Sequence, residues 1–404
     1  MFSEHTTFRF NPAFELVVFD RLEPGLRARL AALNRDPSFY GILLRAGADT
    51  EHVAPDTVRA VDRESALLLL TLRTPGPIPA YARRLLGAGA AHTITSLVLD
   101  GVLEIEDGGV FRSGPGVVQG AALREYDDSA SDADMQGVVP RLSIAALRHG
   151  ATLPMMDVPA LGRRLYRYNS LPLTPSTNVP ASAATDLIRL GANTSAVATA
   201  LDRTWTCAAS GPDGSWVSWS AHARWDTTDA TRGTCKLYVS PALAATREAF
   251  AAVVAAATAH GALAFKAGSG PYGLLRPDKL VMYFRHRDQL HSAAAVLTDA
   301  LAGAPAQGVP FTAAITSDGM VSWAADPPPH AGLVGWSGGE SWRGWLTTQL
   351  AAALIAARGD HGSVDQQPMD RTGIVRFALR RAAALRIDPR TWIPADTLWQ
   401  PATG

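Results

Sequence analysis

Three lysines are the residues whose type and position point most directly to chemistry. The 404-residue chain contains 34 arginines but only three lysines, and Lys236, Lys266 and Lys279 all fall within one short stretch. A chain that uses arginine almost everywhere else indicates that these positions need lysine, because lysine can lose its proton and arginine effectively cannot. The alternative is three ordinary surface lysines that cluster by chance.

The segments around these lysines have the pattern of strands. In Lys236-Leu237-Tyr238 the first and third side chains point to the same face, because side chains alternate along a strand. Lys266 and Lys279 lie at the ends of two further predicted strands. If these strands are neighbours, they bring several cations and the Tyr238 phenol together.

The segment Gly268–Lys279 is glycine-rich and carries Arg276. Glycines let backbone amides approach an anion, and the arginine adds positive charge. The segment lacks the Gly-Lys-Ser/Thr ending of a nucleotide-binding P-loop. A second segment, Gly338–Arg343, leads into a predicted helix, whose N-terminus is a favourable place for an anion. Both segments therefore predict a site for a phosphate group.

Clustered positive charge and partial burial lower the pKa of a lysine, so one lysine in such a site can act as a neutral base. The predicted reaction is β-elimination. The base removes the α-proton of a phosphorylated Ser or Thr, and arginines neutralise the departing phosphate. The alternative is structural: Lys236 and Lys266 extend from strand ends towards solvent, and Tyr238 belongs to a half-buried core.

The predicted architecture is α+β, with a winged-helix-like N-terminal domain and a mixed-sheet second domain. Residues 62–72, 80–86 and 91–99 read as helices and are followed by a hairpin at 102–112, which is the order of a winged helix. The third helix contains no arginine, which argues against DNA reading. Such units also bind leader peptides by strand addition, and plain scaffolding is the alternative.

The second half alternates strands with long helices, the first of which follows a predicted N-cap at Ser240-Pro241. We place the domain boundary at residue 165, after an acidic loop at 125–134. This gives an N-terminal domain of 1–165, whose winged-helix-like part spans about 55–113, and a second domain of 166–404.

Composition excludes several classes of protein. With 37 basic and 37 acidic residues the chain has no excess positive charge for nonspecific nucleic-acid binding. No apolar run is long enough to span a membrane, and residues 1–9 do not resemble a signal peptide. Cys207 and Cys235 form neither a metal site nor a disulfide framework. We expect a cytoplasmic protein without a metal or other cofactor.

The run Cys235–Ser240, about 25 residues of helix, Ala264-Phe265-Lys266, then Arg276 and the strand at 279–284 resembles phosphothreonine-lyase-like proteins. These include bacterial effector lyases and the lyase domains of lanthipeptide synthetases. The likeness is greatest to the HopA-type effector family, whose relatives in actinobacterial peptide clusters work beside a separate kinase. It covers roughly residues 200–360.

This resemblance implies roles for individual residues. Lys266 matches the general base of the family, Lys236 a lysine that contacts phosphate, and Arg276 and Arg343 phosphate-binding arginines. Lys279 is a further candidate phosphate contact because of its position in the sequence alone. The effector lyases use a lysine-x-histidine pair, in which histidine is the general acid, whereas this chain has Tyr238. Either Tyr238 donates the proton, or phosphate leaves unprotonated, or the site has lost catalysis.

The resemblance thus implies the lyase component of a peptide dehydratase, which forms dehydroalanine or dehydrobutyrine in a ribosomal precursor peptide. A separate Ser/Thr peptide kinase would supply the phosphorylated peptide, because this chain has no kinase motif set. The N-terminal domain would hold the leader or dock the kinase. The alternatives are a noncatalytic peptide-binding or kinase-activating module and an effector that acts on host signalling proteins.

Overall fold

The computed structural model describes residues 5–30, 38–47, 59–87, 90–118, 136–173, 195–210, 216–222, 234–326, 341–359, 369–385, 387–389 and 391–393. Its contacts divide the chain into two compact units. The first comprises Met1–Asp127 and Ala356–Leu385, and the second Asp128–Ile355 and Arg386–Gly404. Helices and several sheets occur together, which confirms the predicted α+β class.

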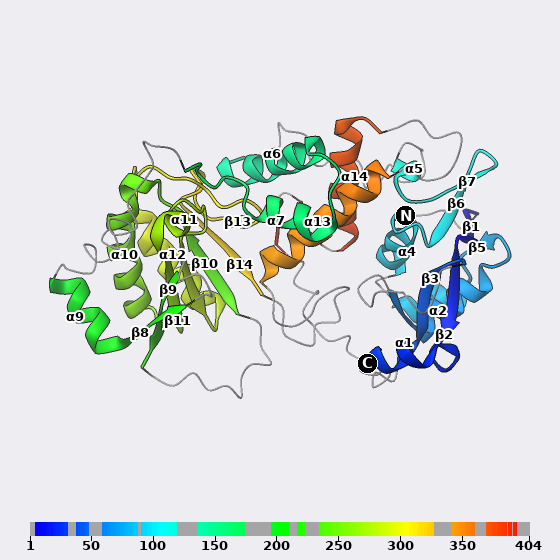
Figure 1. Ribbon diagram of the computed structural model, residues 1–404, viewed down its shortest axis with the longest axis horizontal. Coiled ribbons are helices and arrows are strands. Elements are labelled where there is room, and N and C mark those ends of the chain that lie inside the picture. Colours follow the sequence, from blue (N-terminus) through cyan, green and yellow to red (C-terminus); the bar gives the residue numbers. More distant parts are fainter. Residues whose placement is uncertain are drawn as a thin grey trace. The chain divides into compact units, whose positions relative to one another are not determined.

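The second unit is built on a seven-stranded sheet in which all neighbouring strands are antiparallel (Figure 1). Its order is β13-β14-β10-β12-β11-β9-β8. The strands are β8 (Trp205–Ser210), β9 (Trp216–Ala221), β10 (Cys235–Val239), β11 (Ala264–Gly268), β12 (Leu280–Phe284), β13 (Ala313–Ala314) and β14 (Val321–Ala325).

One face of this sheet carries the hydrophobic core. Leu237, Met282 and Phe265 lie in register on three adjacent strands and are fully buried. Trp219 stacks on Phe265 with 4.9 Å between ring centroids. The helices α9 (Ser195–Thr204), α10 (Thr246–Ala259) and α12 (Arg287–Ala300) pack with these strands. Each such buried side chain contributes about 2 kcal/mol, so this face fixes the register of the sheet.

The opposite face is polar, and segments outside the sheet reach it. They come from α6 (Val138–Thr152), α7 (Val158–Tyr166), α11 (Gly270–Leu274) and α13 (Trp342–Arg358). The Asp157 side chain caps α7 by accepting a hydrogen bond from Ala160 N at 2.6 Å. A Cβ atom at Gly162 would lie 3.4 Å from Thr348 Cα, so glycine allows α7 to pack closely on α13. Tyr166, at the end of α7, is thereby fixed near the sheet.

The first unit contains two small antiparallel sheets, ordered β5-β1-β6-β7 and β2-β3-β4. Its strands are β1 (Thr7–Phe10), β2 (Phe14–Val18), β3 (Phe39–Arg45), β4 (Arg59–Asp62), β5 (Gly76–Pro77), β6 (Leu103–Asp107) and β7 (Val110–Arg112). Its helices are α1 (Pro24–Arg29), α2 (Arg63–Thr71), α3 (Ala80–Leu86), α4 (Ala90–Leu99), α5 (Pro115–Val118) and α14 (Arg371–Ala384). Three helices and a hairpin do follow in the expected order, but the winged-helix assignment stays a prediction.

The two units divide the chain differently from the expected boundary at residue 165. α6 belongs to the second unit, where Val138 N donates to Ser317 O at 2.8 Å and Phe311 N donates to Ser143 Oγ at 2.8 Å. α14 belongs to the first unit, where Ser96 Oγ donates to Ala384 O at 3.1 Å. These contacts join segments far apart in the sequence, so composition alone does not reveal them. The acidic loop expected at 125–134 lies outside the described residues.

The predicted N-cap at Ser240-Pro241 is wrong. A short 3₁₀ turn, η8 (Leu243–Ala245), precedes α10, which begins at Thr246. Ser240 is fully buried instead. Its Oγ donates to Pro277 O at 2.6 Å and accepts from Gly308 N at 3.0 Å. Ser240 therefore ties the end of β10 to the segment that carries Arg276.

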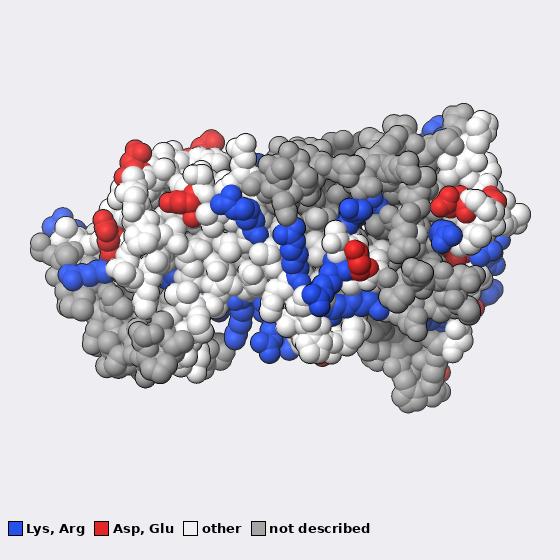
Figure 2. Space-filling model, turned by 90° about the horizontal axis from the view of Figure 1, so that it is seen from above, with Lys and Arg blue, Asp and Glu red and all other residues white. Residues whose placement is uncertain are grey.

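In the surface view of Figure 2 several basic side chains lie close together. Exposed arginines of α6 and α7 are Arg141, Arg148, Arg163 and Arg164. No helix among the described residues is long and apolar enough to cross a membrane.

Candidate functional site

The polar face of the seven-stranded sheet brings Lys236, Tyr238 and Lys266 together. β12 lies between β10 and β11, and Tyr238 and Lys266 both pair with Val281 of β12. Lys236 pairs with Tyr283, two residues further along the same face. The strands that bear the two lysines are thus separated by one strand, and the side chains share a face as alternation predicts.

Tyr283 stands between the two lysines. Its ring centroid lies 5.5 Å from Lys236 Nζ and 5.8 Å from Lys266 Nζ. These two distances bound the separation of the amines at about 11 Å, so both amines face the same part of this surface.

Lys266 differs from Lys236 and Arg276 in its contacts with acidic groups. Its ammonium lies 4.2 Å from the Trp216 ring centroid, and no carboxylate forms an ion pair with it in the described part of the chain. Burial lowers the pKa of Lys266 to about 8; Asp278 opposes this shift, while the nearby cation Lys236 adds to it. A lysine with such a pKa is partly neutral near physiological pH and can accept a proton.

Lys236 has an acidic partner. It forms an ion pair with Asp326, the residue that follows β14. Asp326 Oδ1 also accepts a hydrogen bond from Trp342 N at 2.8 Å, which links Lys236 to the start of α13. The charge of Lys236 is therefore partly compensated before any anion binds.

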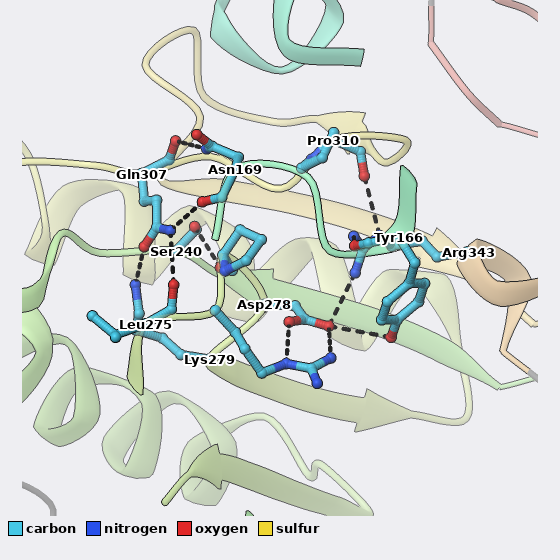
Figure 3. A network of polar contacts seen from close by, with 11 residues as sticks. Tyr166, Asn169, Ser240, Leu275, Asp278, Lys279, Gln307, Pro310 and Arg343 are labelled. Carbon is cyan, nitrogen blue, oxygen red and sulfur yellow. Dashed lines mark hydrogen bonds and ion pairs between the residues drawn. The ribbon is translucent and has the colours of Figure 1, made fainter. Parts of the chain in front are cut away.

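Asp278 is the centre of a buried network (Figure 3). Arg276 donates to both carboxylate oxygens, through Nε at 2.8 Å and Nη2 at 3.0 Å. Arg343 Nη1 donates at 3.0 Å and the Tyr166 hydroxyl at 3.2 Å. Burial alone would raise the pKa of the Asp278 carboxyl, but Arg343 and Arg276 hold this pKa well below its usual range. Asp278 is consequently an anion at physiological pH.

Arg343 and Arg276 have different surroundings. The Arg343 side chain has no exposed surface, and its Nε and Nη2 donate to Pro310 O at 3.1 Å and Tyr166 O at 2.9 Å. The Arg276 side chain remains 18% exposed. The structure thus places Arg276 where an anion can reach it, and Arg343 behind Asp278 as a support.

Lys279 lies in a second network, also drawn in Figure 3. Its buried Nζ donates to Pro241 O at 2.6 Å and to the Gln307 side-chain oxygen. Gln307 Nε2 in turn donates to Leu275 O at 3.2 Å. Burial lowers the pKa of Lys279 to about 7. The structure does not bring this amine to the other cations, so its expected phosphate contact has no geometric support.

Tyr238 is buried, and its ring centroid lies 5.8 Å from the Arg343 guanidinium. Burial raises the pKa of the Tyr238 hydroxyl well above its ordinary value, so this group keeps its proton. Its neighbour in register, Ser322, has a buried Oγ without a hydrogen-bond partner in the described part of the chain.

Cations and aromatic rings alternate across this face, in an arrangement that we call the cation–aromatic chain. Distances from cation to ring centroid run from 4.2 to 5.8 Å. Its members in order are Lys236, Tyr283, Lys266, Trp216, Arg276, Tyr166, Arg343 and Tyr238.

The sequence did not reveal Tyr166, Trp216, Asp278, Tyr283 or Asp326 as site residues. Every second residue after Lys279 shares its face in a strand, and this series includes Tyr283. Asp278 lies two residues after Arg276, so it too could have been predicted as a site residue. Trp216 and Trp219 have different surroundings. Because they are three residues apart on β9, they lie on opposite faces, and only Trp219 joins the core.

The glycine-rich segment has a packing function. A Cβ atom at Gly268 would meet Gly273 O at 2.2 Å, so only glycine fits where β11 contacts α11. Gly268 N donates to Lys279 O at 2.7 Å, which joins the two ends of the segment. Its predicted contact with an anion stays a prediction. Of the other predicted anion segment, Gly338–Arg343, residues 338–340 lie outside the described residues, and Trp342 N donates to Asp326.

Comparisons with known proteins give a distant structural likeness only. No protein-family model matches the chain, and no curated protein sequence matches it. The similar solved structures include an effector protein from Pseudomonas syringae pv. tomato strain DC3000, with 9% identity and a TM-score of 0.37. A second is an effector protein from Pseudomonas syringae pv. syringae strain 61, with 11% identity and a TM-score of 0.34. Each alignment covers 63% of this chain and 97% of the effector.

A likeness as distant as these two says nothing of the role of this chain. Chemistry at the polar face has to be argued from its own residues. These residues are Lys266, whose amine has a lowered pKa, the partly exposed Arg276, the second amine of Lys236 and the buried phenol of Tyr238.

Proposed function

We propose that this protein is a lyase that removes phosphate from phosphoserine or phosphothreonine in a peptide. The observation that carries the proposal is the placement of Lys266 beside Lys236 and Arg276 on one sheet face, with no carboxylate paired to Lys266 in the described residues. A base that must be neutral and an anion-binding group that must be charged are both present there.

In the proposed reaction the neutral amine of Lys266 takes the α-proton of the phosphorylated residue. The electron pair of the Cα–H bond forms the Cα=Cβ double bond, and the Cβ–O bond breaks with its electrons passing to phosphate. The products are dehydroalanine or dehydrobutyrine, inorganic phosphate and the protonated lysine. The elimination needs neither a cofactor nor a redox step, because the substrate and the products together have the same overall oxidation level.

Arg276 and Lys236 are the proposed phosphate contacts. Arg276 already spends Nε and Nη2 on Asp278, which fixes the plane of its guanidinium before substrate arrives. Arg343 acts through Asp278, because each of its three nitrogens already donates to a protein acceptor and its side chain has no exposed surface. Tyr238 is the proposed donor to the departing phosphate: burial keeps it protonated but makes it a weak acid, and the tyrosinate that donation leaves takes a proton back from the protonated Lys266 to close the cycle. Cations that are fixed in place before the reaction, as proposed for Arg276 and Lys236, stabilise the negative charge that develops on a leaving group.

The partners of this lyase would be a separate Ser/Thr peptide kinase and a ribosomal precursor peptide with a leader, as in lanthipeptide-type pathways. The kinase supplies the phosphorylated residue that the lyase consumes. The first unit, which contributes none of the site residues above, would hold the leader or dock the kinase.

The second candidate is a noncatalytic module that binds a peptide or activates the kinase. The observation that favours it is the engagement of Lys236 by Asp326 and of Arg343 by Asp278, which leaves fewer cations for substrate. Such a module needs positive charge at Lys266 but not a titrating amine.

The test uses the full chain and a synthetic precursor peptide that carries one phosphothreonine. The lyase predicts release of phosphate and a product lighter than the phosphopeptide by one phosphoric acid, seen by mass spectrometry. The same reaction is run with the partner kinase added. An unchanged phosphopeptide in both reactions would contradict the proposal and favour the binding module.

A further inference from the structure

The Trp216 ring is shared by two cations of the site. Its centroid lies 4.2 Å from Lys266 Nζ and 4.9 Å from the Arg276 guanidinium. These are two of the three shortest cation–ring distances in the cation–aromatic chain. Like charges repel, so a ring that attracts both stabilises their approach.

The sheet register explains how the ring reaches both groups. Trp216 of β9 pairs with Gly268 of β11, while Lys266 lies two residues earlier on β11 and on the same face. Diagonal neighbours of this kind are within reach of large aromatic side chains. Gly268 has no side chain, so nothing from its own position separates the indole from Lys266.

We propose that Trp216 is a positioning residue, which holds the Lys266 amine and the Arg276 guanidinium at a fixed separation and shields the amine from water. The proposal rests on the proposed function for the roles of base and phosphate contact. Trp216 touches neither proton nor phosphate in this account; it acts through the two cations.

The other charged and titratable groups around Lys266 come from several elements. They are Lys236 on β10, Tyr283 on β12, Arg276 and Asp278 before β12, and Asp326 after β14. Burial is the largest influence on Lys266 and lowers its pKa, while the two carboxylates raise it. The indole supplies part of that burial, and its attraction for the ammonium acts in the opposite direction.

Three substitutions separate these two actions of the ring. Trp216→Ala admits water, so the relief of burial dominates and the Lys266 pKa rises towards the ordinary lysine value. Trp216→Leu keeps apolar bulk without the π face, so the pKa stays or falls. Trp216→Phe keeps an aromatic ring, so the pKa of Lys266 should stay closer to its value in the natural chain than it does in Trp216→Ala. Trp219→Phe, on the core face of the same strand, is the matched control.

The decisive readout does not depend on lyase activity. The chain has only three lysines, so biosynthetic incorporation of ε-¹³C-labelled lysine gives three lysine signals, which are assigned with Lys266→Arg and Lys279→Met. We expect the Lys266 titration midpoint of Trp216→Ala to rise by about one pH unit or more. The Lys279 signal, whose amine contacts Pro241 and Gln307, should not move. Circular dichroism establishes that each variant is folded.

A rise of one pH unit in the Lys266 pKa predicts about a tenfold loss of kcat/KM at pH 7 in Trp216→Ala. Trp216→Phe should restore most of this loss, and Trp219→Phe should leave the pH profile unchanged. A Lys266 midpoint in folded Trp216→Ala equal to that of the natural chain would overturn the proposal. If the natural chain releases no phosphate but the midpoint shifts as expected, the proposed function fails and the positioning by Trp216 stands.

Discussion

The carboxylate of Asp278 and the guanidinium of Arg343 form a 3.0 Å ion pair in which the arginine side chain has no exposed surface. The pair joins the segment before β12 to the start of α13. Arg276 shares the same carboxylate, so the position of the partly exposed arginine depends on a buried one.

Replacement of Asp278 should therefore lower the stability of the folded protein and also disturb the position of Arg276. Asp278→Asn leaves Arg343 buried without a counterion, and breaking such a pair costs about 3–5 kcal/mol. Urea denaturation followed by circular dichroism measures this loss. The control is Asp299→Asn at an exposed position on α12, which should change stability by less than about 0.5 kcal/mol. Equal stability of the two variants would show that Asp278 does not hold Arg343.

The buried amine of Lys279 should make stability depend on pH. Its pKa of about 7 in the folded protein is below the reference lysine value, so the unfolded chain binds more protons above pH 7. Stability should then rise with pH, by up to about 1.4 kcal/mol per pH unit for this residue. The quantity to measure is the unfolding free energy of the natural chain minus that of Lys279→Met, between pH 7 and 9.

That difference should increase with pH in favour of the natural chain. Arg247→Met removes an exposed arginine and empties no buried site, so its difference from the natural chain should stay constant. Parallel curves for all three proteins would contradict the burial of a titrating amine at Lys279.

Asp326 should weaken anion binding by competing for Lys236. Asp326→Asn removes the negative charge, yet its side-chain oxygen can still accept the hydrogen bond from Trp342 N. Calorimetric titration with inorganic phosphate should show binding about threefold tighter or more than in the natural chain. Asp299→Asn again serves as control. Unchanged or weaker binding would argue against Lys236 as a phosphate contact.

Tyr238→Phe tests the proposed proton donor. Loss of the hydroxyl should lower kcat by about 10²-fold or more, because general acids contribute on that scale, and should leave phosphate affinity nearly unchanged. Single-turnover release of phosphate from the phosphothreonine peptide measures the rate. Tyr272→Phe, at an exposed tyrosine on α11, is the matched control. An undiminished rate in Tyr238→Phe would mean that phosphate departs without this proton.

Strand periodicity was enough to place part of the site. The alternation of Lys236 and Tyr238 predicts that these two side chains share a face, and the register of β10, β12 and β11 adds Lys266 to it. Continuing the same alternation from Tyr283 would also have put Lys279 on that face. Its contacts with Pro241 and Gln307 prevail instead, and these depend on tertiary packing.

The remaining site residues could not be read from local pattern because their roles are set by distant partners. Asp278 acquires its role from Arg343, 65 residues away, and Tyr166 from Asp278, 112 residues away. For the same reason the sequence does not show that α6 and α7 pack with the sheet of the second unit. Their contacts with the sheet unit involve residues beyond position 270, which no local window contains.

The central claim is that Lys266 acts as a neutral base, and Lys266→Arg tests it most directly. Arginine keeps the positive charge but stays protonated at any useful pH. The measurement is single-turnover phosphate release from the phosphothreonine peptide, with phosphate affinity measured in parallel. We predict that Lys266→Arg binds phosphate within about threefold of the natural chain and releases none from the peptide. Phosphate release at the natural rate by the arginine variant would contradict the account.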